Sequence, residues 1–190
     1  MEGDKLSLSS VAPTTGSFWH ESLHWSQKEE GAATRVDELI AETEGRLGVS
    51  LPKLLKALYR NRNGGYTSYR FYAKTPDPRP VFDDWHCVIL DGDIHPVHKL
   101  ETLGELSDMV DYGDDDSSFR SRFPNADLLI VLARHGWDCF LCLDYRTDGP
   151  SAEPEVAFLE EGADGLEEVL RVPNFEQLFT GLRKEEEPAL

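Results

Sequence analysis

Residues 128–145 carry the sequence LLIVLARHGWDCFLCLDY, and this stretch decides the fold class. Two apolar runs of strand length, Leu128 to Arg134 and Asp138 to Tyr145, flank His135-Gly136-Trp137, where the glycine favours a turn. The stretch therefore predicts two buried antiparallel strands. A further strand is predicted from Glu155 to Leu159, which is again rich in apolar residues.

The segment from residue 34 to residue 65 has a helical pattern instead. Its apolar positions recur at steps of three and four residues, which predicts an amphipathic helix; they are Val36, Leu39, Ile40, Thr43 and Leu47. Thr34 with Asp37 predicts a capping pair at its start, and Gly48 a left-handed exit. A second helix is predicted to begin at Pro52 and to end at Asn61-Arg62-Asn63-Gly64-Gly65.

Between the helices and the strand pair the sequence predicts shorter elements. Tyr66 to Ala73 is rich in Tyr, Thr and Phe, as strands are. His86 to Leu90 and Ile94 to Val97 are further strand candidates, and Asp91-Gly92-Asp93 between them predicts a hairpin. Leu103 to Val110 is a candidate short helix.

A closing helix is predicted after Val172-Pro173, with Asn174 as its cap and Gln177 three residues further on. Helices, then strands, then a helix is the order typical of an α+β protein. We therefore expect one domain with a mostly antiparallel sheet and the helices packed on one side of it. Its expected limits are residues 34–183, with 1–33 as a partly ordered N-terminal extension and 184–190 as a solvated acidic tail.

The charge of the chain restricts its partners. Among its 190 residues 36 are acidic and 19 basic, which gives a formal net charge of −17. Residues 1–70 hold nine acids and nine bases, so the whole excess lies after residue 70. A negative field of this size repels nucleic acid and favours a basic partner, although the same charge can serve solubility alone.

Compartment and membrane association follow from what the sequence lacks. The start Met1-Glu2-Gly3-Asp4 is acidic where a signal peptide is basic, and the longest apolar run, Leu128 to Ala133, has six residues, far short of a membrane helix. Three cysteines are too few for a disulfide scaffold. We expect a cytoplasmic protein without membrane contact; its oligomeric state is not predicted.

Several pairs of residues resemble metal or redox sites but lack the required context. Cys139 and Cys142 have C-x-x-C spacing, yet residues three apart in a strand point to opposite faces. The same argument applies to His95 and His98, and His20 and His24 have no evident third ligand. The run Asp114-Asp115-Asp116 lacks the ligand alternation of a calcium loop. We therefore predict no cofactor, no metal and no catalytic site.

Three motifs together resemble one family. The first runs from Val36 through Leu47-Gly48 and Leu51-Pro52 to Asn63-Gly64-Gly65. The second is Gly136-Trp137-Asp138 with its strand to Leu143-Asp144-Tyr145 and then Pro154-Glu155-Val156, and the third is 174–179, NFEQLF. In this order they resemble the SUKH superfamily, in its Smi/Knr-like branch, over about residues 34 to 183.

This resemblance implies an α+β fold without catalytic residues. It also implies a role in protein binding, because bacterial members are mostly immunity proteins that neutralise toxins, often nucleases or deaminases, while fungal members are scaffolds linked to cell-wall synthesis. Our leading hypothesis is an immunity protein for a basic toxin; the alternatives are a regulatory or scaffold module without a toxin and, third, an enzyme.

The predicted partner surface is the acidic middle of the chain. Trp85, Trp137, Tyr112 and Phe119 border it, and core or edge packing would explain these aromatic residues. Aromatic residues beside carboxylates also suit an interface for a basic protein, since rings supply desolvated contacts and acids steer association. The candidate partner-binding residues are Trp85, Asp111, Tyr112, Asp114, Asp115 and Asp116.

Overall fold

The structure is a computed structural model that describes residues 13–19, 35–67, 69–73, 86–88, 93–107, 116–135, 139–162 and 165–184. Its main element is a six-stranded sheet with the order β3-β5-β6-β7-β8, in which β4 also pairs with β5. Every pairing in it is antiparallel. The strands are β3 (Asp93–Ile94), β4 (Glu101–Thr102), β5 (Leu129–His135), β6 (Cys139–Asp144), β7 (Glu155–Gly162) and β8 (Gly165–Val172). The predicted strand pair and the predicted strand from Glu155 are thus confirmed.

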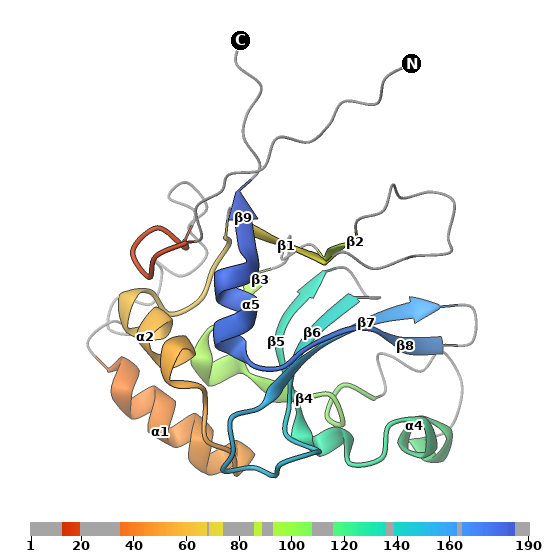
Figure 1. The fold of residues 1–190 in the computed structure, drawn as a ribbon. Coiled ribbons are helices and arrows are strands. Elements are labelled where there is room, and N and C mark those ends of the chain that lie inside the picture. The colour runs from red at the N-terminus through yellow and green to blue at the C-terminus, as the bar shows by residue number, and fades with distance from the viewer. Residues whose placement is uncertain are drawn as a thin grey trace, which may run out of the picture.

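A smaller sheet has the order β2-β1-β9, formed by β2 (His86–Val88), β1 (Tyr69–Ala73) and β9 (Leu182–Lys184). It lies beyond the top of the main sheet in Figure 1. The predicted hairpin around Asp91-Gly92-Asp93 is wrong, because β2 pairs with β1 whereas β3 pairs with β5. The two short strands therefore belong to different sheets.

Three helices cover one face of the main sheet: α1 (Val36–Leu47), α2 (Lys53–Asn61) and α5 (Phe175–Gly181). Gly48 ends α1 in the left-handed conformation, with φ 69°, as predicted. The predicted cap of α1 is wrong: the N-cap is Arg35, which makes no side-chain capping bond. Pro52 is the N-cap of α2 and not its first helical residue. Asn174 caps α5 as predicted, accepting a hydrogen bond from the Gln177 backbone at 2.8 Å.

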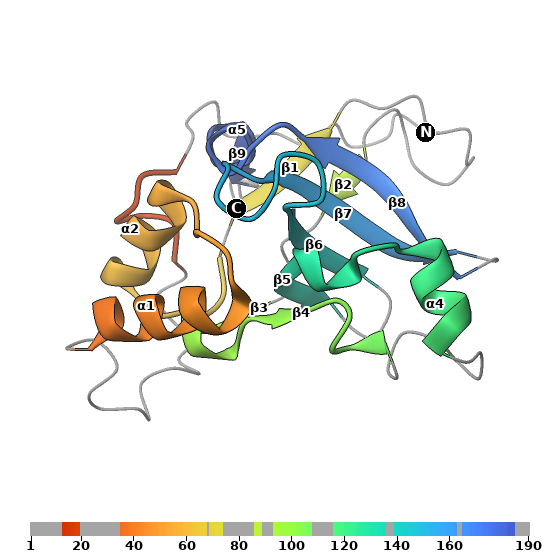
Figure 2. The same ribbon diagram turned by 90° about the horizontal axis from the view of Figure 1, so that it is seen from below.

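The opposite face of the sheet is also covered, which corrects the prediction of helices on one side. In Figure 2, α4 (Asp116–Arg122) lies across the sheet from α1 and α2. Phe119 and Phe123 place their rings 5.5 Å apart and pack with Leu129, Phe140 and other buried residues of this face. Leu103–Leu106, predicted as the start of a helix, forms turns on the same side. A short 3-10 helix, η3 (Ala126–Leu128), leads into β5.

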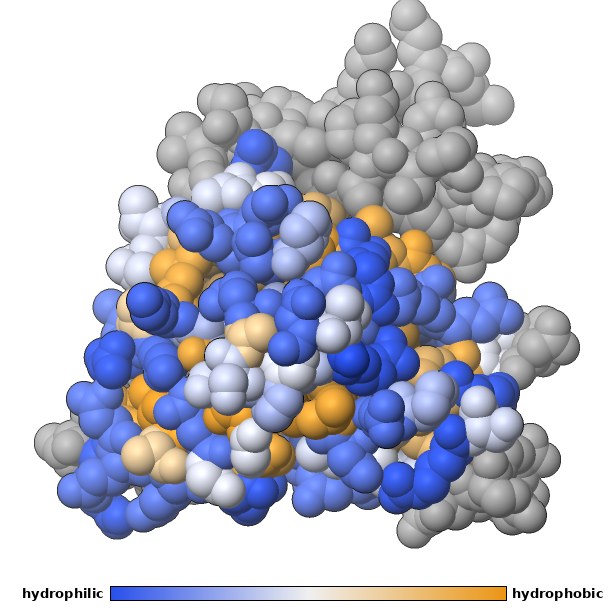
Figure 3. Space-filling model, turned by 60° about the horizontal axis from the view of Figure 1, so that its bottom comes forward, coloured by the Kyte–Doolittle hydropathy of each residue, from blue (hydrophilic) through white to orange (hydrophobic). Residues whose placement is uncertain are grey.

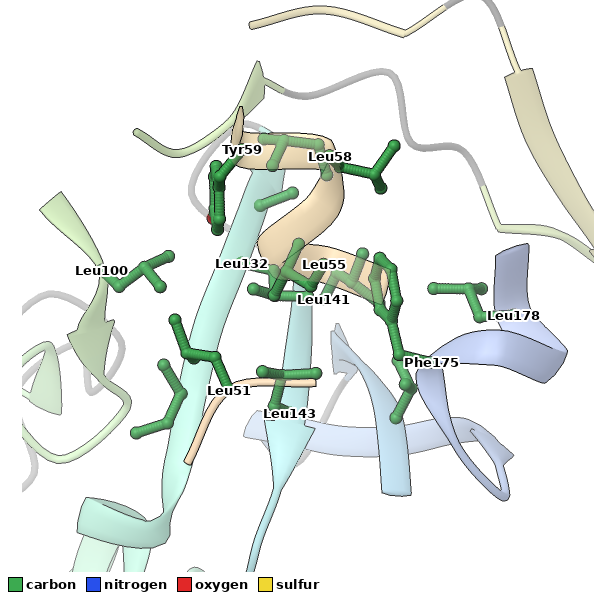
Figure 4. Close-up of a cluster of buried hydrophobic side chains, with 14 of the residues drawn as sticks. Leu51, Leu55, Leu58, Tyr59, Leu100, Leu132, Leu141, Leu143, Phe175 and Leu178 are labelled. Carbon is green, nitrogen blue, oxygen red and sulfur yellow. The ribbon is translucent and has the colours of Figure 1, made fainter. Parts of the chain in front are cut away.

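The larger core lies between the sheet and α1, α2 and α5 (Figure 4). Leu55 and Leu58 of α2 are fully buried there. Each leucine buried in this way stabilises the fold by roughly 1.5–3 kcal/mol. Labelled members of the same core in Figure 4 are Leu51, Tyr59, Leu100, Leu132, Leu141, Leu143, Phe175 and Leu178.

Residues 13–19 add two aromatic side chains, Phe18 and Trp19, to this core. Phe18 is only 2% exposed, and its ring lies 4.8 Å from Trp19 and 5.7 Å from Phe179 of α5. Thr67 donates a hydrogen bond to the Phe18 carbonyl at 2.7 Å. This part of the predicted N-terminal extension is therefore packed onto the domain.

Candidate functional site

Most of the predicted partner-binding residues lie outside the described residues. This applies to Trp85, Asp111, Tyr112, Asp114 and Asp115. Asp116 is the first residue of α4, and only its backbone is described. The predicted surface in the acidic middle of the chain therefore stays a prediction. His20 and His24 fall outside the described part of the chain as well.

The motif residues of α1 and α2 make internal contacts. Glu44 accepts a hydrogen bond from the Leu51 backbone at 2.7 Å and one from the Lys56 ammonium at 2.9 Å. Thr43, one residue earlier, is 2% exposed and donates to the Val97 carbonyl at 3.1 Å. These bonds hold the Leu-Pro segment and the 3-10 helix η2 (Val97–Lys99) against α1. Thr43 and Glu44 of this motif therefore have a structural role.

Asn63-Gly64-Gly65 has a comparable structural role. The Asn63 side chain is buried and accepts a hydrogen bond from the Val97 backbone at 2.8 Å. Gly65 exchanges two backbone hydrogen bonds with Ile94, at 2.9 and 3.0 Å. Gly64 has φ 89°, and a Cβ there would lie 2.7 Å from the Pro96 nitrogen. Only glycine fits such a close backbone approach, so the motif joins α2 to the segment after β3.

Asp144, at the end of β6, organises the most elaborate polar cluster among the described residues. Its carboxylate accepts from Arg146 Nε at 2.9 Å and Nη2 at 2.7 Å, and from Arg171 Nη2 at 2.9 Å. Arg171, on β8, also donates to Glu155 at 2.6 Å and to Glu168 at 2.8 Å. We call these five residues the Asp144 cluster. It joins β6, β7 and β8 on the face that α4 covers in part.

The electrostatics of the Asp144 cluster favour a charged carboxylate. The Asp144 side chain is only 1% exposed. Burial raises its pKa, but hydrogen bonds from Arg146 and Arg171 outweigh this effect, and the pKa lies below its usual value. A buried, ionised carboxylate with two arginine partners is a structural clamp, because no lone pair is left facing a cleft.

The histidine and cysteine pairs do not converge. Cys142 is buried in the core on the α4 side, where burial raises the pKa of its thiol, whereas the neighbouring Leu141 and Leu143 face the other core. The predicted strand from Ile94 to Val97 is wrong beyond Ile94, so the strand argument for His95 and His98 does not apply: His98 lies in η2 and His95 before it. Both are half-buried, and burial lowers the pKa of His95. The described residues contain no group of three or more His, Cys, Asp or Glu side chains placed to hold a metal.

The remaining features are on the outer side of β8. A groove of about 420 Å³ lies between the end of β8 and α5. Phe71, Leu170 and Val172 are among its lining residues, with Gln177 and Thr180 from α5. Next to it, residues 155–172 of the β7–β8 hairpin contain six acids and one base. Sequence reasoning missed this surface because β8 itself was not predicted.

The face shown in Figure 3 is largely hydrophilic, and its hydrophobic residues form separate spots. Such spots are ordinary on a protein surface that contacts water. No helix among the described segments is long and apolar enough to cross a membrane.

The architecture is that of a single-domain α+β protein whose motif residues hold the fold together. Comparison with family models places the chain more closely: residues 36–181 match the SMI1/KNR4 family (SUKH-1). The chain belongs to this family. Its members are generally non-catalytic. No match was found among curated proteins or among solved structures.

Proposed function

We propose that this chain is a cytoplasmic, non-catalytic protein-binding domain: an immunity protein that binds and neutralises a basic toxin of the nuclease or deaminase type. The observation that carries the proposal is the placement of charge. The net charge is −17, and all of the excess lies after residue 70. Such a field speeds association with a cationic protein and repels nucleic acid.

The contacts of the family's motif residues also support the proposal. The motif residues Glu44, Asn63 and Asp144 are engaged in internal hydrogen bonds. Since the scaffold is held by these contacts, partner binding falls to the exposed acidic segments. Groups buried in this way are not available for chemistry on a substrate.

The test is co-expression with the product of the neighbouring reading frame. If this product is a basic toxin domain, the two proteins should co-purify, and the association rate should fall steeply as salt is raised. Reversing the charges of Asp114, Asp115 and Asp116 should slow association at low salt. A neutral toxin, or a complex whose association rate does not depend on salt, contradicts the proposal.

A regulatory or scaffold module without a toxin partner is the second candidate, and the SMI1/KNR4 match favours it. A neighbouring gene without any toxin domain would favour this function. In that case the protein should bind a partner encoded elsewhere, and co-expression should not protect cells from any neighbouring product.

A further inference from the structure

Strand β8 is at the edge of the main sheet. It pairs with β7 over Gly165–Val172, and no strand in the described ranges pairs with its other edge. The ladder between β7 and β8 is interrupted once, between Phe158 and Leu159. The outer N–H and C=O groups of an edge strand are a template for a further strand.

The side chains around this edge determine which strand could be added. Glu161 and Glu167 are exposed, and Glu167 lies directly opposite Glu160 across the two strands. Glu168 is already paired with Arg171. Like charges at directly opposed positions destabilise a sheet. A strand that brings cations would be attracted by these carboxylates. A second copy of the same edge would add to it, so the acids select against self-association.

The groove at the end of β8 adds an apolar contact. Leu170, Val172 and Pro173 of the β8 end line it together with Phe71 of β1. Gln177 and Thr180 of α5 are exposed and supply polar groups to the same groove. Arg171 also lines the groove, with its guanidinium paired to Asp144, Glu155 and Glu168. A peptide that follows β8 would thus meet acids along the hairpin and apolar side chains at its end. Backbone pairing with side-chain pockets is one general mode of peptide recognition.

We propose that the outer edge of β8 binds an extended basic segment of the partner protein as an added strand. Lysine or arginine side chains of the segment face the glutamates of the hairpin, and an apolar side chain enters the groove beside Phe71. This inference rests on the proposed function, because it names the surface and the mode by which a basic partner is held.

The probe is a capped, fluorescent seven-residue peptide in which lysine alternates with valine. A second peptide has the same sequence with N-methyl groups on alternate amides, which remove hydrogen bonds and leave the charge unchanged. We expect the first peptide to bind at low salt. The affinity of the N-methylated peptide should be lower by at least about tenfold. Hydrogen exchange should slow at the amides of β8.

The matched variants carry equal charge changes on two surfaces. Glu161→Lys with Glu167→Lys alters the edge, and Glu38→Lys with Glu42→Lys alters exposed acids of α1. The edge variant should lose about tenfold or more in peptide affinity, and the α1 variant less than about threefold. Equal losses in both variants, or equal binding of the two peptides, would show attraction by net charge alone and overturn the inference.

The same variants distinguish this inference from the proposed function. If the toxin from the neighbouring gene binds the edge variant as well as it binds the unaltered protein, the inference is wrong and the immunity function stands. If the unaltered protein binds neither the toxin nor the lysine peptide, the proposed function fails and this inference fails with it. Circular dichroism of the edge variant checks that its fold is intact.

Discussion

Replacing Asp144 with asparagine is expected to lower the free energy of unfolding by about 2–3 kcal/mol at about pH 7. The substitution keeps the size of the side chain and one acceptor oxygen, but it removes the charge that Arg146 and Arg171 share. Breaking a buried ion pair costs roughly 3–5 kcal/mol when the remaining charge has no other partner. Here the Arg146 side chain is 21% and the Arg171 side chain 31% exposed, and Arg171 keeps Glu155 and Glu168 as partners. The expected cost is therefore about 2–3 kcal/mol, at or below the lower end of that range.

The pH dependence separates the charge of Asp144 from its shape. The pKa of Asp144 is lowered in the folded protein, so its carboxylate stabilises the fold fully above the unfolded pKa of about 3.9. This contribution is lost as the pH falls through the lower folded pKa. Asparagine does not titrate. The difference in stability between the original protein and the variant should therefore be largest near neutral pH and shrink below about pH 4.

Urea denaturation followed by tryptophan fluorescence, at about pH 7 and at about pH 3, measures both effects. Asp148→Asn is the matched control, because Asp148 is exposed in the following turn; it should change stability by less than about 0.5 kcal/mol. A cost below about 1 kcal/mol at neutral pH, or a cost that stays the same in acid, would refute the clamp.

Three further outcomes are expected. Phe18→Ala should lower the free energy of unfolding by about 3–4 kcal/mol in urea, because the ring is buried; an unchanged midpoint would mean that residues 13–19 are not part of the core. Gly64→Ala should cost more than Gly149→Ala, since both glycines have positive φ but only Gly64 faces backbone within 3 Å; equal costs would contradict this close approach. Cys139 should react with a thiol reagent faster than the buried Cys142, as peptide mapping by mass spectrometry would show; equal rates would contradict the difference in burial between the two thiols.

The long elements could be predicted because their local pattern agrees with their environment. β5 and β6 are buried on both faces, so their apolar runs are continuous. β8 was missed because it contains two adjacent charged residues, Glu167 and Glu168, and the register shift between Glu168 and Leu170 breaks the alternation. Only its pairing with β7 makes this charged segment a strand. β9 has three residues and likewise depends on its partner, β1.

The pairing of strands that are distant in the sequence was not predicted correctly either. His86 to Leu90 was predicted as a strand that pairs with Ile94 to Val97, but the strand His86–Val88 pairs with β1 instead. A turn sequence between two short strands does not fix their partner when other edges are free. The helix α4, in contrast, had a local signal, since Phe119 and Phe123 are one helical turn apart. The Asp144 cluster had no local signal, because its members come from three strands and from the turn after β6.

The contacts of the motif residues explain why the sequence predicts the family better than the partner. Glu44 holds the Leu-Pro segment, Gly64 fits against Pro96, and Asp144 is closed in by two arginines. A substitution at any of these positions leaves a buried group unpaired or a backbone contact overfilled, so the fold constrains them whatever the protein binds. Glu161 and Glu167 of the β7–β8 hairpin have no comparable constraint, because their side chains are exposed. Such positions can change with the partner at little cost to stability. Binding specificity in this chain is therefore expected where its motifs are absent, and Glu161 and Glu167 of the β7–β8 hairpin meet this condition among the described residues.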